Sequence, residues 1–316
     1  MIRAKNGNNN MKRDIERLVD RRCLRIQITL LQGCLIAVCL FKTLSCAQAQ
    51  GLKHDRGDLL AYQTERHKLN TEDAGPTEPG DYEVGFRYAL KKSRHQFDSD
   101  GRQEKRGRLK EHAFDWGISV GLLPGADISA GFGYADIFDG EHGNDGMDGD
   151  GITDLEVASK ILIYKHLQKN MAISFKPSLT LPTGEKSDND ECGPGDEYAS
   201  FTQRLILSKN NGRWNFNLDS GCQFPFGQKR GDFRGSWETN AAIGYQICSW
   251  IQPAIELNYC HDFYVSNADS DTWGCTAELI LSAHERYRID IGFQNILAGR
   301  STDQTMSAVV AVTFFL

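Results

Sequence analysis

From Asp81 to the C-terminus, apolar side chains recur at every second residue, and this alternation returns after almost every turn. In the first segment, Phe86 and Leu90 fall on one face, whereas Glu83 and Arg87 fall on the other. A period of two predicts a β-strand with two chemically different faces. About twelve segments follow this rule, near 81–91, 114–122, 128–134, 154–163, 171–180, 197–208, 213–224, 236–248, 251–264, 272–282, 286–296 and 305–316. An even number of antiparallel strands is typical of bacterial outer-membrane barrels.

The connections between these segments alternate in length. Short turns fall at Pro124-Gly125-Ala126 and at 166–169, whereas the connections 94–108, 138–150 and 182–196 are long and rich in charged residues and glycine. Short periplasmic turns opposite long external loops are the plan of an outer-membrane barrel. We therefore expect an all-β, antiparallel, up-and-down transmembrane barrel with both termini in the periplasm of the bacterial outer membrane.

The strands of a soluble β-sandwich also alternate between apolar and polar residues, so a sandwich is the alternative fold. Trp214 and Trp250 fall at the short-turn end of the expected strands, and Trp237 and Trp273 fall at the long-loop end. Two aromatic girdles at the membrane interfaces would produce this placement. The mean hydropathy of −0.46 excludes a helical membrane bundle but suits a barrel, in which only alternate residues face lipid. The sequence favours the membrane barrel and leaves the soluble fold open.

The first fifty residues have the three parts of a secretory signal. A basic stretch around Arg21 precedes an apolar run over 28–41, and Ala47-Gln48-Ala49 follows. We expect residues 1–49 to be a signal peptide, with either Met1 or Met11 as the true start, and a retained anchor as the alternative. Residues 50–79 are polar and aperiodic, which predicts a flexible periplasmic segment before the barrel at 80–316. A short plug is the alternative for this segment.

Composition and motifs exclude several classes of function. The formal charge of −6 and the pI near 5.8 give no basic face for nucleic acid. No local motif of a nucleophile, a Walker loop or a zinc protease is present, so we expect no enzyme and no cofactor. The five cysteines after the leader have no zinc-ligand spacing, so we expect no metal, and their disulfide pairing stays open. The loop Asp139–Asp154 could gather oxygen ligands for Ca²⁺, but a solvated loop fits it better because the EF-hand order is missing.

Two stretches resemble a known family. Pro79-Gly80-Asp81-Tyr82-Glu83-Val84-Gly85 opens the first segment, and Gly149-Asp150-Gly151-Ile152-Thr153-Asp154-Leu155-Glu156-Val157-Ala158-Ser159-Lys160 is followed by Leu181-Pro182-Thr183-Gly184. Together they resemble the outer-membrane family named for the meta-cleavage pathway of phenol degradation, over roughly residues 79–316. The resemblance implies a porin-like transporter for aromatic or other hydrophobic small molecules, without catalytic residues. A structural or adhesive barrel with a closed lumen is the alternative.

The polar face of the strands supplies the candidate functional residues. The expected lumen-lining residues are Glu83, Arg87, Asp115, Asp154, Glu156, Lys160, Lys176, Arg204, Asp219, Glu238, Glu256, Glu278, Arg288 and Asp290. Charges inside a barrel either set ion selectivity or pair across neighbouring strands and fill the interior. Because nine of these residues are acidic and five are basic, an open lumen would prefer cations weakly.

The last segment, 305–316, ends in Phe314-Phe315-Leu316. It resembles the C-terminal strand through which outer-membrane proteins reach the barrel-assembly machinery, although Leu316 replaces the usual terminal aromatic residue. The expected partners are therefore this machinery, outer-membrane lipid and a small solute.

Overall fold

The computed structural model describes residues 68–140, 147–186, 193–227, 231–284 and 286–316. The expected signal peptide and residues 50–67 lie outside this described part, so the domain boundaries stay a prediction. No helix in the described ranges has the length and apolar character required to span a membrane.

The described residues form one antiparallel sheet that closes on itself. Its strands are β1 (Tyr82–Phe97), β2 (Gln103–Leu123), β3 (Ala126–Asp139), β4 (Met147–Ile152), β5 (Leu155–His166), β6 (Met171–Leu181), β7 (Ala199–Asn211), β8 (Trp214–Phe226), β9 (Phe233–Tyr245), β10 (Ile251–Tyr264), β11 (Ser270–His284), β12 (Tyr287–Arg300) and β13 (Thr302–Phe315). A single 3-10 turn, η1 (Leu167–Lys169), joins β5 to β6.

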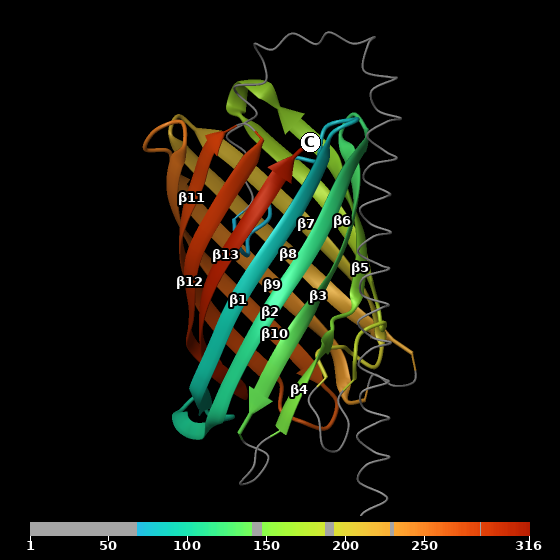
Figure 1. Cartoon of the computed structure of the whole chain (residues 1–316), viewed down its shortest axis with the longest axis vertical. Coiled ribbons are helices and arrows are strands. Elements are labelled where there is room, and N and C mark those ends of the chain that lie inside the picture. The colour runs from blue at the N-terminus through green and yellow to red at the C-terminus, as the bar shows by residue number, and fades with distance from the viewer. Residues whose placement is uncertain (1–67, 141–146, 187–192, 228–230, 285) are drawn as a thin grey trace, which may run out of the picture. The chain divides into compact units, whose positions relative to one another are not determined.

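Closure depends on one pairing beyond the simple meander, that of the first strand, β1, with the last, β13. The consecutive strands β2 and β3 pair as a hairpin, and together these pairings leave the sheet without a free edge along the wall (Figure 1). β4 and β5 both pair with β3 and are separated only at Thr153 and Asp154, so they form two parts of one wall strand. The predicted twelve-strand up-and-down barrel is confirmed.

The alternation along each strand gives an inside-out distribution of polarity. On β10, Ile255 and Leu257 are 54% and 57% exposed on the outer surface, whereas Glu256 between them is fully buried. The same contrast holds on β12, where Phe293 is 51% exposed and Asp290 is 2% exposed. A protein that exposes its large apolar side chains and buries its carboxylates is suited to a hydrocarbon solvent rather than to water.

The two ends of the barrel differ, but less than the sequence suggests. Tight turns such as the one at Gly125, with a φ of +84°, lie at the end that carries the C-terminus, which is the upper end in Figure 1. At the opposite end, β1 and β2 continue as a hairpin as far as Phe97 and Gln103, and β4 extends β3. The expected long loop 94–108 is therefore largely strand, and residues 138–139 and 147–150 of the second expected loop also belong to strands. Apolar and polar residues do not alternate in these strand extensions, because both faces of the extensions lie outside the apolar outer band of the barrel.

Leu257 lies in the middle of β10 and tests the lipid-facing surface. Replacing it by Arg should lower the free energy of unfolding in lipid vesicles by ~2–4 kcal/mol, the cost of a cation at the middle of the bilayer. Thr202→Arg, on the inner wall beside Glu238, is the matched control and should change the stability little. Equilibrium unfolding in guanidinium, followed by tryptophan fluorescence, measures both. Equal effects of the two substitutions would contradict the assignment of faces.

Candidate functional site

Residues 68–77, called here the lumen segment, lie inside the barrel and make hydrogen bonds to its inner wall. The light-blue trace of these residues runs within the outline of the strands in Figure 1. The backbone N–H of Ala74 donates to Ser208 Oγ at 2.8 Å, and the N–H of Thr77 donates to Asp127 Oδ2 at 2.8 Å. Wall strands on several sides of the barrel therefore hold this segment.

Three buried carboxylates of the wall accept backbone N–H groups of the lumen segment. Glu256 receives the N–H of Thr71 at 2.6 Å, the Thr71 hydroxyl at 2.7 Å and the N–H of Asn70 at 3.1 Å. Glu278 receives the N–H of Leu69 at 2.9 Å, and Asp219 receives the N–H of Glu72 at 2.8 Å. A buried carboxylate needs such donors, because removing it from water without them costs several kcal/mol. The lumen segment thus supplies the donors that replace water.

Ion pairs add to this attachment. Glu72 pairs with Lys176 of β6 and with Lys160 of β5, the latter at 3.5 Å. Lys68 donates to Asn215 Oδ1 at 2.5 Å. Burial lowers the pKa of Lys68 to about 8, against the opposing effect of Glu278 nearby. The lumen segment is therefore held by charged groups at both of its ends and along its length.

The lumen segment lies within the range 50–79, for which a flexible periplasmic segment, or a short plug as the alternative, stays a prediction. The chain leaves the lumen past Gly121 of β2, where the carbonyl oxygen of Glu78 occupies the space that a Cβ would need. Pro79 bridges to Gly121, and the N–H of Gly80 donates to the Gly121 carbonyl at 3.1 Å. Polar residues without a period predict a loop. They do not reveal that the donors of this loop match acceptors contributed by five different strands.

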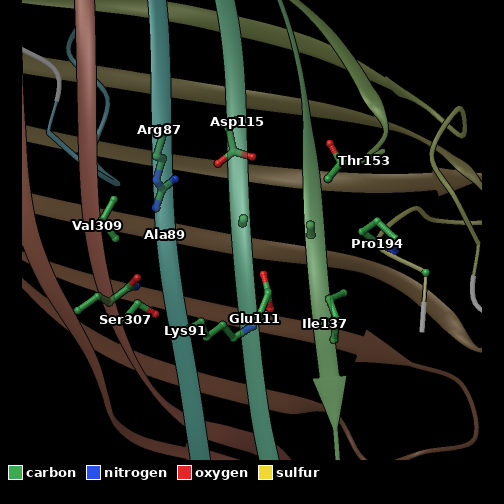
Figure 2. A pocket seen from close by; sticks show the side chains of 14 residues that line it. Arg87, Ala89, Lys91, Glu111, Asp115, Ile137, Thr153, Pro194, Ser307 and Val309 are labelled. Atoms are coloured by element: carbon green, nitrogen blue, oxygen red, sulfur yellow. Dashed lines mark hydrogen bonds and ion pairs between the residues drawn. The ribbon is translucent and has the colours of Figure 1, made fainter. Parts of the chain in front are cut away.

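A cavity of about 480 Å³ opens on the inner face of β1, β2 and β3. Arg87 and Asp115 lie at one level of this cavity, and Lys91 and Glu111 point toward one another at another level (Figure 2). The Lys91 ammonium is 3.2 Å from the Glu111 carboxylate. Between the two levels the wall is apolar and small, and Pro194, from the connection between β6 and β7, covers part of the opening.

A second cavity, of about 260 Å³, lies against β5 to β9 and is more polar. Arg204 bridges Asp219 and Glu238 across it, with 2.5 Å between the guanidinium and Glu238 Oε2. Glu156 and Lys176 also line it. Most of the charges in this cavity are therefore paired with each other.

The other predicted residues have various surroundings. Glu83 lies on β1 opposite Ser119, and Arg288 donates to Asp290 at 2.9 Å on β12. Asp154 lies in the break between β4 and β5, and its side chain binds the backbone of the β6–β7 connection. Its carboxylate accepts from the N–H of Gly184 at 2.7 Å and from the N–H of Asp196 at 2.8 Å. Asp154 thus orders an external connection.

Several charged residues of the lumen were not among the candidates that the sequence supplied. Asp127, which is 4% exposed, anchors Thr77 but stands one residue before the point where the apolar period of β3 becomes visible. Glu72 was hidden in an aperiodic segment. Lys91 and Glu111 lie at or beyond the ends of the expected strands. Longer predicted strands would have placed them opposite each other on β1 and β2.

The four candidate girdle tryptophans are all exposed on the outer surface of the barrel, between 44% and 53%. Trp214 stacks on Tyr245 with 4.7 Å between ring centroids near the short turns, where Trp250 also lies. Near the other end, Tyr259 packs between Trp237 and Trp273, at 5.8 Å and 4.4 Å. Amphipathic rings at two levels suit the two interfaces of a bilayer.

No metal centre or disulfide is present among the residues that the structure describes. These residues contain no group of three potential His, Cys, Asp or Glu ligands, and Cys222, Cys248, Cys260 and Cys275 are free thiols. In the loop considered for Ca²⁺, Asp139 accepts from Arg106 at 2.6 Å. Asp145 of that loop lies outside the described residues.

The comparisons with known proteins agree with this architecture. The family model described as "Putative MetA-pathway of phenol degradation" matches residues 114–293. An outer membrane channel from Pseudomonas putida F1 is similar in structure, with a TM-score of 0.68 and 13% sequence identity over 79% of this chain and 100% of that chain. No curated protein matches the chain in sequence.

Two further solved structures are more distant. The KdgM porin has a TM-score of 0.46 and 13% identity over 73% of this chain and 98% of that chain. The CymD monoaromatic hydrocarbon channel has a TM-score of 0.42 and 6% identity over 75% of this chain and 89% of that chain. Similarities this low carry no functional argument. The closed barrel and its apolar outer surface place this chain in the bacterial outer membrane.

Glu256 tests how the lumen segment is attached. Glu256→Gln removes the charge from an acceptor of three hydrogen bonds, and bonds to a charged group contribute ~1.5–3 kcal/mol each. Hydrogen exchange of the Asn70 and Thr71 amides should therefore accelerate by a factor of ~10 or more. Glu156→Gln, in the second cavity, is the control and should leave these amides protected. Unchanged exchange in both variants would show that Glu256 does not hold the segment.

Proposed function

This chain belongs to the family described as "Putative MetA-pathway of phenol degradation", and from that premise we propose that it is an outer-membrane channel for the uptake of small aromatic or other hydrophobic molecules. The observation that carries the proposal is a partly apolar cavity of about 480 Å³ inside a closed membrane barrel. Cavities of ~300–1,000 Å³ are of the size that holds small molecules.

The composition of the larger cavity supports a hydrophobic solute over a sugar or an inorganic ion. Its wall includes Ala89, Ala113, Ala135, Ile137 and Val309 beside its charged groups. An apolar solute can leave water for these side chains, whereas a hydrophilic one would gain few hydrogen bonds from them. The charges expected to select ions are largely engaged elsewhere, because Glu256, Glu278 and Asp219 all bind the lumen segment.

The lumen segment obstructs the part of the interior near the short turns, so passage requires its displacement. Its contacts are hydrogen bonds and ion pairs with polar wall residues, which water can replace once the segment moves. A closed resting state that opens for a solute follows from this arrangement. The acidic excess of the lumen would still favour cations weakly in the opened state.

A structural barrel with a permanently closed lumen is the second candidate. The number of hydrogen bonds between the lumen segment and the wall favours it. The two proposals differ in one measurable property, because a closed barrel passes no solute under any condition.

Liposome swelling separates the candidates. Liposomes that contain the full-length mature protein should swell in phenol and benzoate faster than in sucrose of equal osmolarity, because the cavity wall is partly apolar. Liposomes without protein serve as the control for leakage. Equal rates for protein and empty liposomes with every solute would support the closed structural barrel.

Replacing residues 68–77 by a glycine-serine sequence of the same length tests the obstruction. Single-channel conductance in planar bilayers should increase at least several-fold, because the replacement removes the Thr71 and Glu72 side chains that anchor the segment, and a flexible glycine-serine chain maintains the backbone hydrogen bonds less well. The Glu156→Gln variant should conduct like the unmodified protein. An unaltered conductance after the replacement would mean that the segment does not limit passage.

A further inference from the structure

The larger cavity contains a flat apolar floor made of three alanines. Ala89 of β1 is in register with Ala113 of β2, and Ala113 is in register with Ala135 of β3. Neighbouring strands are ~4.8 Å apart, so the three residues make a floor ~10 Å wide. On β1 the inward-facing neighbours Arg87 and Lys91 are longer and each lie two residues, or ~7 Å, from the alanine row. The alanine floor is therefore a recess between two charged rows.

Apolar groups also border this recess on its sides. Val309 of β13 is in register with Ala89, and Ile137 stands next to Ala135 along the inner face of β3. Pro194 approaches from the β6–β7 connection (Figure 2). A recess with a flat floor and apolar borders suits a flat ring better than a hydrated polar group.

Arg87, at the edge of the alanine floor, makes no hydrogen bond and no salt bridge with any residue that the structure describes, and its Nε is buried. Asp115 stands opposite Arg87 in register, and the two opposite charges interact. The Asp115 Oδ1 is directed toward β3, 2.6 Å from where a Cβ on Gly133 would lie. Asp115 therefore attracts Arg87 without accepting a hydrogen bond from it.

The other cation of the cavity is already satisfied. Lys91 pairs with Glu111 at 3.2 Å. Arg87 therefore remains as the cation of the cavity that makes no hydrogen bond or salt bridge within the described part of the chain. Burying part of a guanidinium without an acceptor is unfavourable, and its planar set of donors matches a carboxylate in a two-point hydrogen bond.

We propose that this cavity binds a small aromatic carboxylate, with its ring on the alanine floor and its carboxylate on Arg87. The proposal rests on the proposed channel function and narrows its solute class from aromatic molecules to aromatic acids. The lumen as a whole stays acidic, so Arg87 acts as a local binding group rather than as the source of an anion-selective field. A neutral phenol would cover the same floor but leave the guanidinium without a full partner.

Equilibrium dialysis of the full-length mature protein in detergent, with radiolabelled benzoate and phenol, tests the site. Benzoate should bind at least ~10-fold more tightly than phenol, because a hydrogen bond to a charged group contributes this much affinity. Arg87→Gln should abolish that difference and leave phenol binding unchanged. Arg213→Gln removes the same charge from an exposed turn and should bind both ligands as the unmodified protein does.

Two further variants keep the test decisive if Arg87→Gln folds poorly. Ala113→Leu fills the recess above the alanine floor and should lower the affinity for both ligands. Asp115→Asn removes a negative charge next to Arg87 and should raise the affinity for benzoate alone. Equal affinity for benzoate and phenol, or a full benzoate affinity in Arg87→Gln protein, would overturn the proposal. If benzoate binds as expected but liposomes never swell, the channel function fails and the site stands. If liposomes swell and benzoate does not depend on Arg87, the site fails and the channel stands.

Discussion

The structure depends on the need of every backbone polar group to find a partner within the protein, because hydrocarbon offers none. The pairing of the first strand, β1, with the last, β13, meets this need by closing the sheet, so that no strand edge along the wall faces lipid. Closure also fixes which face of each strand meets which solvent. Ile255 and Leu257 consequently face outward, and Glu256 between them has to be accommodated inside.

The interior then meets a second constraint, which is the cost of burying charge. Wall residues satisfy part of it by pairing, as Arg204 does with Asp219 and Glu238. The lumen segment satisfies another part by donating backbone N–H groups to Glu256 and Glu278. The segment is therefore both an obstruction and a component of the electrostatic balance of the barrel. Displacing it requires water or a solute to take over those hydrogen bonds, which links opening to solvation of the wall.

The larger cavity is the part of the interior that these constraints leave unfilled. Its floor is made of alanines rather than of charged or aromatic residues, and the buried Nε of Arg87 has no hydrogen-bond acceptor among the described residues. A site with an unpaired hydrogen-bond donor beside an apolar recess suits a ligand that has both a hydrogen-bond acceptor and an apolar group. The small second cavity lacks this property, because Arg204 is already paired.

Period-two alternation determined the strands, their number and their two faces from sequence, because each side chain in a strand reports on its own solvent. It also determined that Arg87 and Asp115 share the inner wall. The course of residues 68–77, the turn of Asp115 toward Gly133 and the role of Asp154 in ordering a connection were decided only by the tertiary structure. These features depend on contacts between residues far apart in the chain. Local polarity cannot show such contacts. A polar, aperiodic sequence is equally suited to bulk water and to a lumen whose wall supplies hydrogen-bond acceptors.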